Sequence, residues 1–182
     1  LHESRQRPGS RSIMPTSTIP LPVLSELNRQ LNHELAAAYG YQAAALWCVC
    51  ENLSGFAEFF EKQAVEERAH AQRIIDHVQN RRGAVQLQPL PAPPQEFGSL
   101  LELAQKALEM EQTNTRGINA VYEAAFAAKD YPAQVLMHWF INEQVEEESW
   151  AVEMIERVRA ASCAGGLAAL DRHIMGFLAD KA

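Results

Sequence analysis

Apolar residues recur at the spacing of an α-helix along almost the whole chain, and this periodicity restricts the fold more than any other feature. The pattern divides into four long runs, and no alternation typical of strands stands out. We therefore predict an all-α protein whose four main helices cover residues 24–49, 56–78, 100–128 and 132–161. Helices of about 30 residues span about 40 Å, which is long enough to enclose a substantial core.

The breaks between the four runs indicate how the helices are connected. Residues 52–55 and 130–132 are short breaks, and we predict Ser54 and Ser99 as the N-caps of the second and third helices. Residues 86–97 contain four prolines, so this stretch is predicted to be an extended connector. Because short joins give antiparallel neighbours and a long join crosses the bundle, the sequence predicts an antiparallel four-helix bundle with one long crossover connection.

We predict one domain, residues 21–182, which ends in a short fifth C-terminal helix after Gly165-Gly166. Residues 1–20 are predicted to form a flexible N-terminal extension, within which Met14 resembles a natural start residue. This stretch is rich in arginine and serine, and it lacks the apolar segment of a secretory signal. It therefore carries no weight in the prediction of the fold.

Composition excludes several classes of function. The formal net charge of −7 disfavours nucleic acid as a partner and suits cations. The chain has no apolar run of about 18 residues, so we predict no membrane partner. Its three cysteines lack the spacing of a disulfide framework, which favours reduced thiols and a cytoplasmic location.

A repeat with a spacing of 77 residues relates the first helix pair to the second. It matches residues of similar type at similar heights: Glu34 with Glu111, Glu67 with Gln144, and His70 with Glu147. The i, i+3 spacing places Glu67 and His70 on one helix face, and the same holds for their counterparts. All six positions lie near the middle of their helices, so an antiparallel bundle brings them to one level.

Four carboxylates in a bundle core need counter-charges, because an unpaired buried charge costs several kcal/mol. Two divalent cations balance the four negative charges, while neutral His70 and Gln144 supply further ligands. Oxygen ligands with one imidazole suit Fe(II), and also Mn(II) or Zn(II). Tyr41 follows Glu34 by two helical turns and faces the same layer. The competing interpretation places these acids on solvated helix faces, but it does not explain the match across four helices.

The stretches LNHELAAAYGYQ, EERAHAQRI, LEMEQTNTRGIN and HWFINEQVEEE resemble the bacterial non-haem ferritins, and the resemblance extends over residues 22–180. It implies a ferritin-like fold and self-association into a hollow 24-subunit cage. It also implies ferroxidase activity, in which Fe(II) is oxidised by dioxygen or peroxide at a di-iron site within each subunit. The ferric product is then deposited as mineral inside the cage, which is iron storage.

The resemblance also implies a role for each matching residue. One iron is held by Glu34, Glu67, His70 and Glu111, while Glu67, Glu111, Gln144 and Glu147 form the bridge and the surroundings of the second iron. Tyr41 matches a tyrosine beside the site and is the candidate catalytic residue. A possible third iron site matches Glu66, Glu143 and Glu146, shared with Glu147. Trp139 matches a tryptophan near the ligands, with either core packing or electron donation as its role. Trp47 and Trp150 are interpreted as core or interface aromatics.

Other functions remain as alternatives. Haem is not expected, because the helix at 56–78 has no methionine to bind it and the fourth helix carries Gln144-x-x-Glu147 in place of a second Glu-x-x-His. A bundle that buffers metal, or is purely structural, would bind cations without turnover. A di-iron oxidase acting on an organic substrate would need an open pocket beside the ligands.

Overall fold

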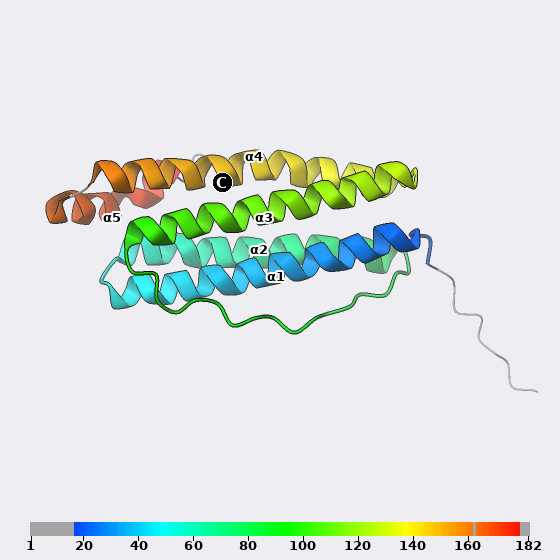
Figure 1. Cartoon of the computed structure of the whole chain (residues 1–182), viewed down its shortest axis with the longest axis horizontal. Helices are drawn as coiled ribbons and strands as arrows, with labels where there is room; N and C mark the ends of the chain where they lie inside the picture. The colour runs from blue at the N-terminus through cyan, green and yellow to red at the C-terminus, as the bar shows by residue number, and fades with distance from the viewer. Residues whose placement is uncertain (1–16, 162, 179–182) are drawn as a thin grey trace, which may run out of the picture.

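The computed structural model describes residues 17–161 and 163–178, which form five helices and no strand (Figure 1). The helices are α1 (Leu21–Cys50), α2 (Ser54–Asn80), α3 (Leu100–Ala127), α4 (Tyr131–Ala160) and α5 (Ala164–Leu178). The predicted all-α class is confirmed. α1 begins three residues before its predicted start because Pro22 is accommodated in the first turn. α5 begins at Ala164, so the two glycines lie in its first turn and do not precede it.

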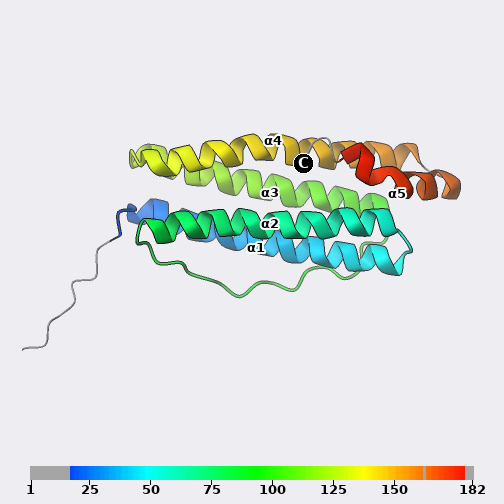
Figure 2. The same cartoon turned by 180° about the vertical axis from the view of Figure 1, so that it is seen from behind.

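The four long helices lie side by side along one axis, and α5 lies at one end of the bundle, where it contacts α2 and α4 (Figures 1 and 2). α1 packs against α2 and α3, and α3 packs against α4. The segment between α2 and α3 runs along the outside of the bundle from one end to the other (Figure 1). This is the predicted crossover, and because of it α3 runs in the same direction as α2, whereas a simple up-and-down bundle would have these two helices antiparallel.

The crossover segment is held by side chains of α1. Asn28 Nδ2 donates to the carbonyl of Ala84, and Asn28 Oδ1 accepts from the backbone N–H of Gln86 at 2.7 Å. One turn later, Asn32 bonds the carbonyl of Gln86 and the N–H of Gln88 in the same way. Two asparagines one helical turn apart therefore supply the hydrogen bonds that the backbone of residues 84–88 needs. They hold the segment in place ahead of its proline-rich half.

The start of α2 differs from its prediction. Ser54 is the first helical residue and not the N-cap, and the residue before it makes no side-chain cap. Instead, Asp171 of α5 accepts hydrogen bonds from the backbone N–H groups of Gly55 and Phe56 at 2.9 and 3.0 Å. A Cβ on Gly55 would lie 1.8 Å from the carbonyl oxygen of Asp171, so only glycine permits this contact. α5 thus caps a helix that lies more than 100 residues earlier in the chain.

The two later long helices begin with a cap from the residue next to them in the chain. Ser99 accepts from the N–H of Glu102 and caps α3, as predicted. Asp130 caps α4 through the N–H of Ala133. Asp130 also forms an ion pair of 2.7 Å with Arg81, which follows the last residue of α2.

Residues 17–20 are packed against the bundle, in contrast to the flexible extension predicted for residues 1–20. The N–H of Thr18 donates to the carbonyl of Arg81, and the guanidinium of Arg81 donates to the carbonyl of Thr18 at 2.7 Å. Ile19 is 5% exposed and belongs to the core. Burial of this apolar side chain draws the four residues onto the bundle. Residues 1–16 lie outside the described part of the chain.

The apolar core is divided into two parts along the bundle axis. One part, at the end where α5 lies, contains Tyr41, Phe56, Phe60 and Trp150. The other, at the opposite end, contains leucine, isoleucine and valine together with Phe140. Between them, each long helix contributes buried polar side chains near its middle. No helix in the described residues is both long and apolar enough to cross a membrane.

Candidate metal centre

The polar layer between the two apolar cores consists of the residues that the 77-residue repeat singles out. All are at most 4% exposed: Glu34, Glu67, His70, Glu111, Gln144 and Glu147. Because each lies near the middle of a helix that runs the length of the bundle, the fold brings them to one height. Burial of four carboxylates in one layer is costly unless cations, protons or hydrogen-bond donors compensate the charge.

Three ligand atoms of this layer meet without a hydrogen-bond partner. Nδ1 of His70 lies 3.4 Å from Oε2 of Glu67 and 3.9 Å from Oε2 of Glu34. All three atoms are buried and make no hydrogen bond in the structure. Unpaired buried polar atoms are rare, and each costs about 1–3 kcal/mol. One divalent cation at this point would satisfy two carboxylates and an imidazole together, so the donor set fits a metal ion.

A second group of ligand atoms lies on the side of the layer formed by α2 and α4. Atoms of Glu66, His70, Glu143 and Glu147 lie within 4.8 Å of one another. Glu66 and Glu143 are partly exposed, so this group opens toward solvent while the first is closed. Glu146, the third acid predicted for this site, is exposed and belongs to neither group.

Aromatic donors orient the other two carboxylates. The Tyr41 hydroxyl donates to Oε1 of Glu111, and the Trp150 indole N–H donates to Oε2 of Glu147. Tyr41 is fully buried between the rings of Phe60 and Trp150. The sequence led us to interpret Trp150 as a core or interface aromatic only. Its i, i+3 spacing from Glu147 was the available signal, since these side chains share a helix face.

A hydrogen-bond chain sets the direction of the Gln144 amide. Its Nε2 donates to Thr115 Oγ1 at 3.1 Å and to the Glu111 carbonyl at 3.1 Å, and the Thr115 hydroxyl donates to Glu148 at 2.6 Å. Because Nε2 of Gln144 is directed to α3 by these hydrogen bonds, Oε1 of the same amide is the atom that is available to bind a cation. Sequence reasoning named Gln144 but not Thr115, which has no ligand chemistry of its own.

The electrostatics of the layer favour protons or cations. Burial raises the pKa of Glu67 well above its usual range, and the charges of Glu111 and Glu34 raise it further. Burial also raises the pKa of Glu147 strongly and that of Glu111 to about 7. Burial raises the pKa of Tyr41 as well, so this side chain remains a neutral phenol. The charges of Glu111, Glu34 and Glu147 all act on Glu67, so this carboxyl lies at the centre of the negative charge of the layer.

Trp139 is linked to the layer through His70. The two rings meet edge-on with centroids 5.4 Å apart, and the guanidinium of Arg73 lies 3.7 Å from the Trp139 ring centroid. The Trp139 ring therefore packs against the His70 imidazole and under the Arg73 guanidinium. Both of its predicted roles, packing and electron donation, are compatible with this position.

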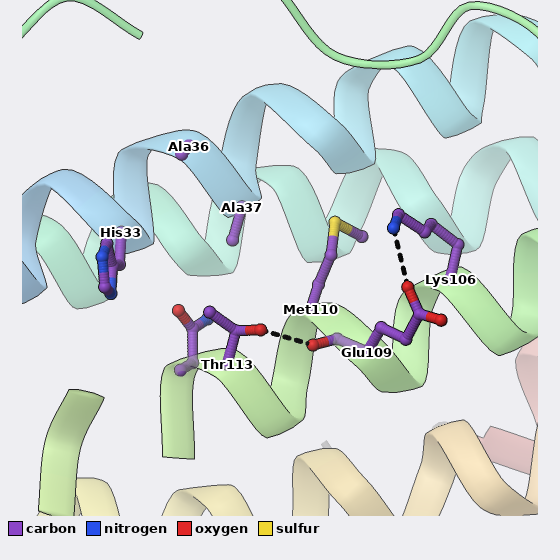
Figure 3. Close-up of a pocket in the computed structure, with 8 residues that line it drawn as sticks. His33, Ala36, Ala37, Lys106, Glu109, Met110 and Thr113 are labelled. Atoms are coloured by element: carbon purple, nitrogen blue, oxygen red, sulfur yellow. Dashed lines mark hydrogen bonds and ion pairs between the residues drawn. The ribbon is translucent and has the colours of Figure 1, made fainter. Parts of the chain in front are cut away.

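A pocket between α1 and α3 lies beside the polar layer (Figure 3). His33 and Met110, which precede Glu34 and Glu111, line it together with Ala37 and Thr113, and the Met110 side chain extends from α3 toward α1. Its volume is about 230 Å³ and no ligand residue lines it. Sites for organic molecules usually measure roughly 300–1,000 Å³. This pocket therefore does not supply the opening that an oxidase of an organic substrate needs.

Comparisons with known proteins agree with this geometry. Residues 24–161 match the family described as Ferritin-like domain. The bacterial non-heme ferritin of Staphylococcus aureus (strain USA300) is 42% identical over 127 residues, which cover 70% of this chain and 76% of the relative. The open pore ferritin of the archaeon Archaeoglobus fulgidus superimposes with a TM-score of 0.83 at 32% identity, over 86% of this chain and 97% of that one. The chain belongs to the ferritin family.

Proposed function

We propose that this protein stores iron and is a ferroxidase, which oxidises Fe(II) at the buried layer and deposits ferric mineral inside a cage. The observation that carries the proposal is the convergence of Glu34 Oε2, Glu67 Oε2 and His70 Nδ1, three buried ligand atoms with no hydrogen-bond partner. The names of the relatives support it, because they are non-heme ferritins. A further structural relative, a PmFTN variant with a TM-score of 0.81, was soaked in iron.

Iron is the substrate of this reaction. One Fe(II) binds to Glu34, Glu67, His70 and Glu111, and a second binds between Glu67, Glu111, Gln144 and Glu147. Each Fe(II) gives up one electron, and dioxygen takes both electrons and two protons to become hydrogen peroxide. The carboxylates hold the two cations close together and disperse the added positive charge of the ferric products. Tyr41 holds Glu111 in place through its hydroxyl.

Fe(II) added in air to the purified protein should give a rapid rise in ferric absorbance. The iron should then co-elute with a particle of about half a megadalton, which corresponds to 24 copies of a 20.3 kDa chain. Absorbance after mixing and light scattering on the eluted particle measure the two results. Metal binding without rapid oxidation would favour the metal-buffering alternative, while only monomer or dimer at neutral pH would contradict the cage.

The second group of ligand atoms predicts a third iron site. We propose that Glu66, Glu143 and Glu146 contribute to it, together with Glu147. Replacement of these first three acids by alanine should leave two-iron binding and fast oxidation intact, because the buried layer is unchanged. Anaerobic Fe(II) titration should give three sites per subunit in the wild type and two in the triple variant.

Two further variants make the Fe(II) titration more specific. A double variant of Glu66 and Glu143 tests the acids that the structure groups with His70, and its difference from the triple variant measures the share of the exposed Glu146. Glu123→Ala, an exposed acid of α3, is the matched control. Equal stoichiometry in the wild type and the triple variant would assign these residues to a solvated helix face.

We also propose that the protein acts in the cytoplasm, with iron ions and dioxygen or peroxide as its partners. Cys48, Cys50 and Cys163 are free thiols, which accords with a reducing compartment. No haem is part of the proposal.

A further inference from the structure

One fully buried amide in the polar layer is not among the predicted ligands. Gln30 of α1 is 0% exposed and lies one turn before Glu34. Its Nε2 donates a hydrogen bond of 2.8 Å to Oε1 of Glu34. The other oxygen of this carboxylate, Oε2, accepts no hydrogen bond and lies 3.9 Å from His70 Nδ1. The two oxygens of Glu34 therefore have different tasks, and the amide determines which one faces the ligand cluster.

A glycine on the facing helix makes room for this amide. A Cβ at Gly117 of α3 would lie 1.8 Å from Gln30 Oε1 and 2.9 Å from Gln30 Cδ. Either distance is far below van der Waals contact, so any larger residue at this position would displace the Gln30 side chain. Glycine is less favourable than alanine inside a helix. The close approach of Gln30 explains why α3 contains a glycine in its middle.

Other carboxylates of the layer are oriented in a comparable way. Tyr41 donates to one oxygen of Glu111, and Trp150 donates to one oxygen of Glu147. Neither donor is itself suited to bind a cation in place of the carboxylate. Gln30 supplies the same kind of support to Glu34 from the opposite side of the layer. Groups that hydrogen-bond a ligating carboxylate fix its direction and thereby raise the affinity of the site.

We propose that Gln30 is a positioning residue for the metal centre, which holds Glu34 with Oε2 toward the cation, and that Gly117 supplies the space for it. The inference rests on the proposed metal site. An amide N–H suits this role because it donates without adding charge to the layer. When the metal binds, Glu34 is already turned toward it, so binding needs no rotation of the carboxylate.

Anaerobic titration with Co(II) tests this role without any oxidation step. Gln30→Leu removes the donor at similar side-chain volume, and it should weaken Co(II) binding at the site of Glu34, Glu67 and His70 by roughly 10- to 100-fold. The d–d absorption of that ion should change, because Glu34 becomes free to bind through both oxygens. Co(II) binding beside Glu111 and Glu147 should keep its affinity.

Gly117→Ala tests the same contact from the other helix. The added Cβ should displace the Gln30 amide and weaken the same Co(II) site, while Co(II) binding beside Glu111 and Glu147 keeps its affinity. Gln134→Leu is the matched control. It removes a partly buried glutamine that donates to the Ala125 carbonyl near one end of the bundle.

The outcomes separate this inference from the proposed function. Wild-type Co(II) affinity and spectrum in Gln30→Leu would overturn the inference, and so would equal weakening of both Co(II) sites with a lower melting temperature, because this indicates a general structural role. A wild-type protein that binds Co(II) but fails to oxidise Fe(II) would refute the ferroxidase proposal and leave the role of Gln30 in place.

Discussion

We expect Glu67→Ala and His70→Ala each to abolish the fast phase of Fe(II) oxidation, with only slow mineral formation remaining. Glu67 lies among the charges of Glu111, Glu34 and Glu147, so its loss removes the carboxylate that we propose to lie between the two irons. His70 belongs to both groups of ligand atoms and is the imidazole of each. Since displacement of a reacting group by about 1 Å costs roughly 100-fold in rate, we expect a loss of at least that size. Stopped-flow absorbance of the ferric product measures it.

Two exposed residues provide matched controls for this experiment. Glu123→Ala removes an exposed carboxylate of α3, and His138→Ala removes an exposed imidazole of α4 that stacks on Tyr122. Both should oxidise Fe(II) at the wild-type rate. Wild-type rates in the Glu67 and His70 variants, with the controls also unchanged, would show that the reaction takes place elsewhere in the molecule.

We expect the metal-free Glu67→Gln variant to melt higher than the metal-free wild type at pH 7.5. Burial raises the pKa of Glu67 well above its usual range, which shows that the folded layer disfavours this charge. The amide has nearly the same shape without the charge. A gain of about 2 kcal/mol is the expected order, which for a chain of this length corresponds to roughly 4–8 °C in melting temperature. Calorimetry after chelation of all metal measures it.

The difference in stability between metal-free Glu67→Gln and the wild type should depend on pH in a defined direction. A carboxyl whose pKa is raised by folding binds its proton more tightly in the folded state, so its contribution to stability is present at low pH and is lost as the pH rises through the folded pKa. For Glu111 this window runs from the ordinary value of about 4.5 to about 7. The advantage of Glu67→Gln should therefore be small at pH 4.5 and grow toward neutral pH.

Metal should reverse the order of the melting temperatures of the wild type and Glu67→Gln. Anaerobic addition of Zn(II) supplies the counter-charge that the wild-type layer lacks, so it should raise the melting temperature of the wild type more than that of the variant. Glu123→Gln, an exposed acid, should change neither the metal-free stability nor the response to Zn(II). A constant difference between Glu67→Gln and wild type across the pH range would contradict the predicted charge repulsion in the layer.

Most of the bundle was predictable because its signals are local. The period of the apolar residues gave the four long helices, and the four prolines between residues 86 and 97 gave the crossover. The polar layer could be predicted for a different reason. The repeat pairs Glu34 with Glu111 and Glu67 with Gln144, so positions far apart in the sequence could be placed at one height once the helices were known.

Other features of the site gave a weak signal in the sequence or none. Gln30 lies in α1 four residues before Glu34 and shares its helix face, but the polar residues around it do not indicate that this position is buried. Its role depends on a glycine of α3, 87 positions later, and on the distance between two helix axes. The indole of Trp150 has an apolar body, which is why it was interpreted as a packing residue, and only its contact with Glu147 shows the polar task of its N–H.

The ends of the helices also divide into features that the local sequence predicts and features that depend on packing. Ser99 caps α3 from the adjacent position, and a cap of this kind can be predicted from a short stretch of sequence. The cap of α2 comes from Asp171, because the docking of α5 places its carboxylate on free N–H groups that Ser54 does not cap. Helix period, connector and ligand types are set within single segments, so the sequence alone determined them. Which oxygen faces a cation, and which distant side chain caps or supports a helix, depends on atoms of segments that meet only after packing. Those features were decided by the tertiary structure.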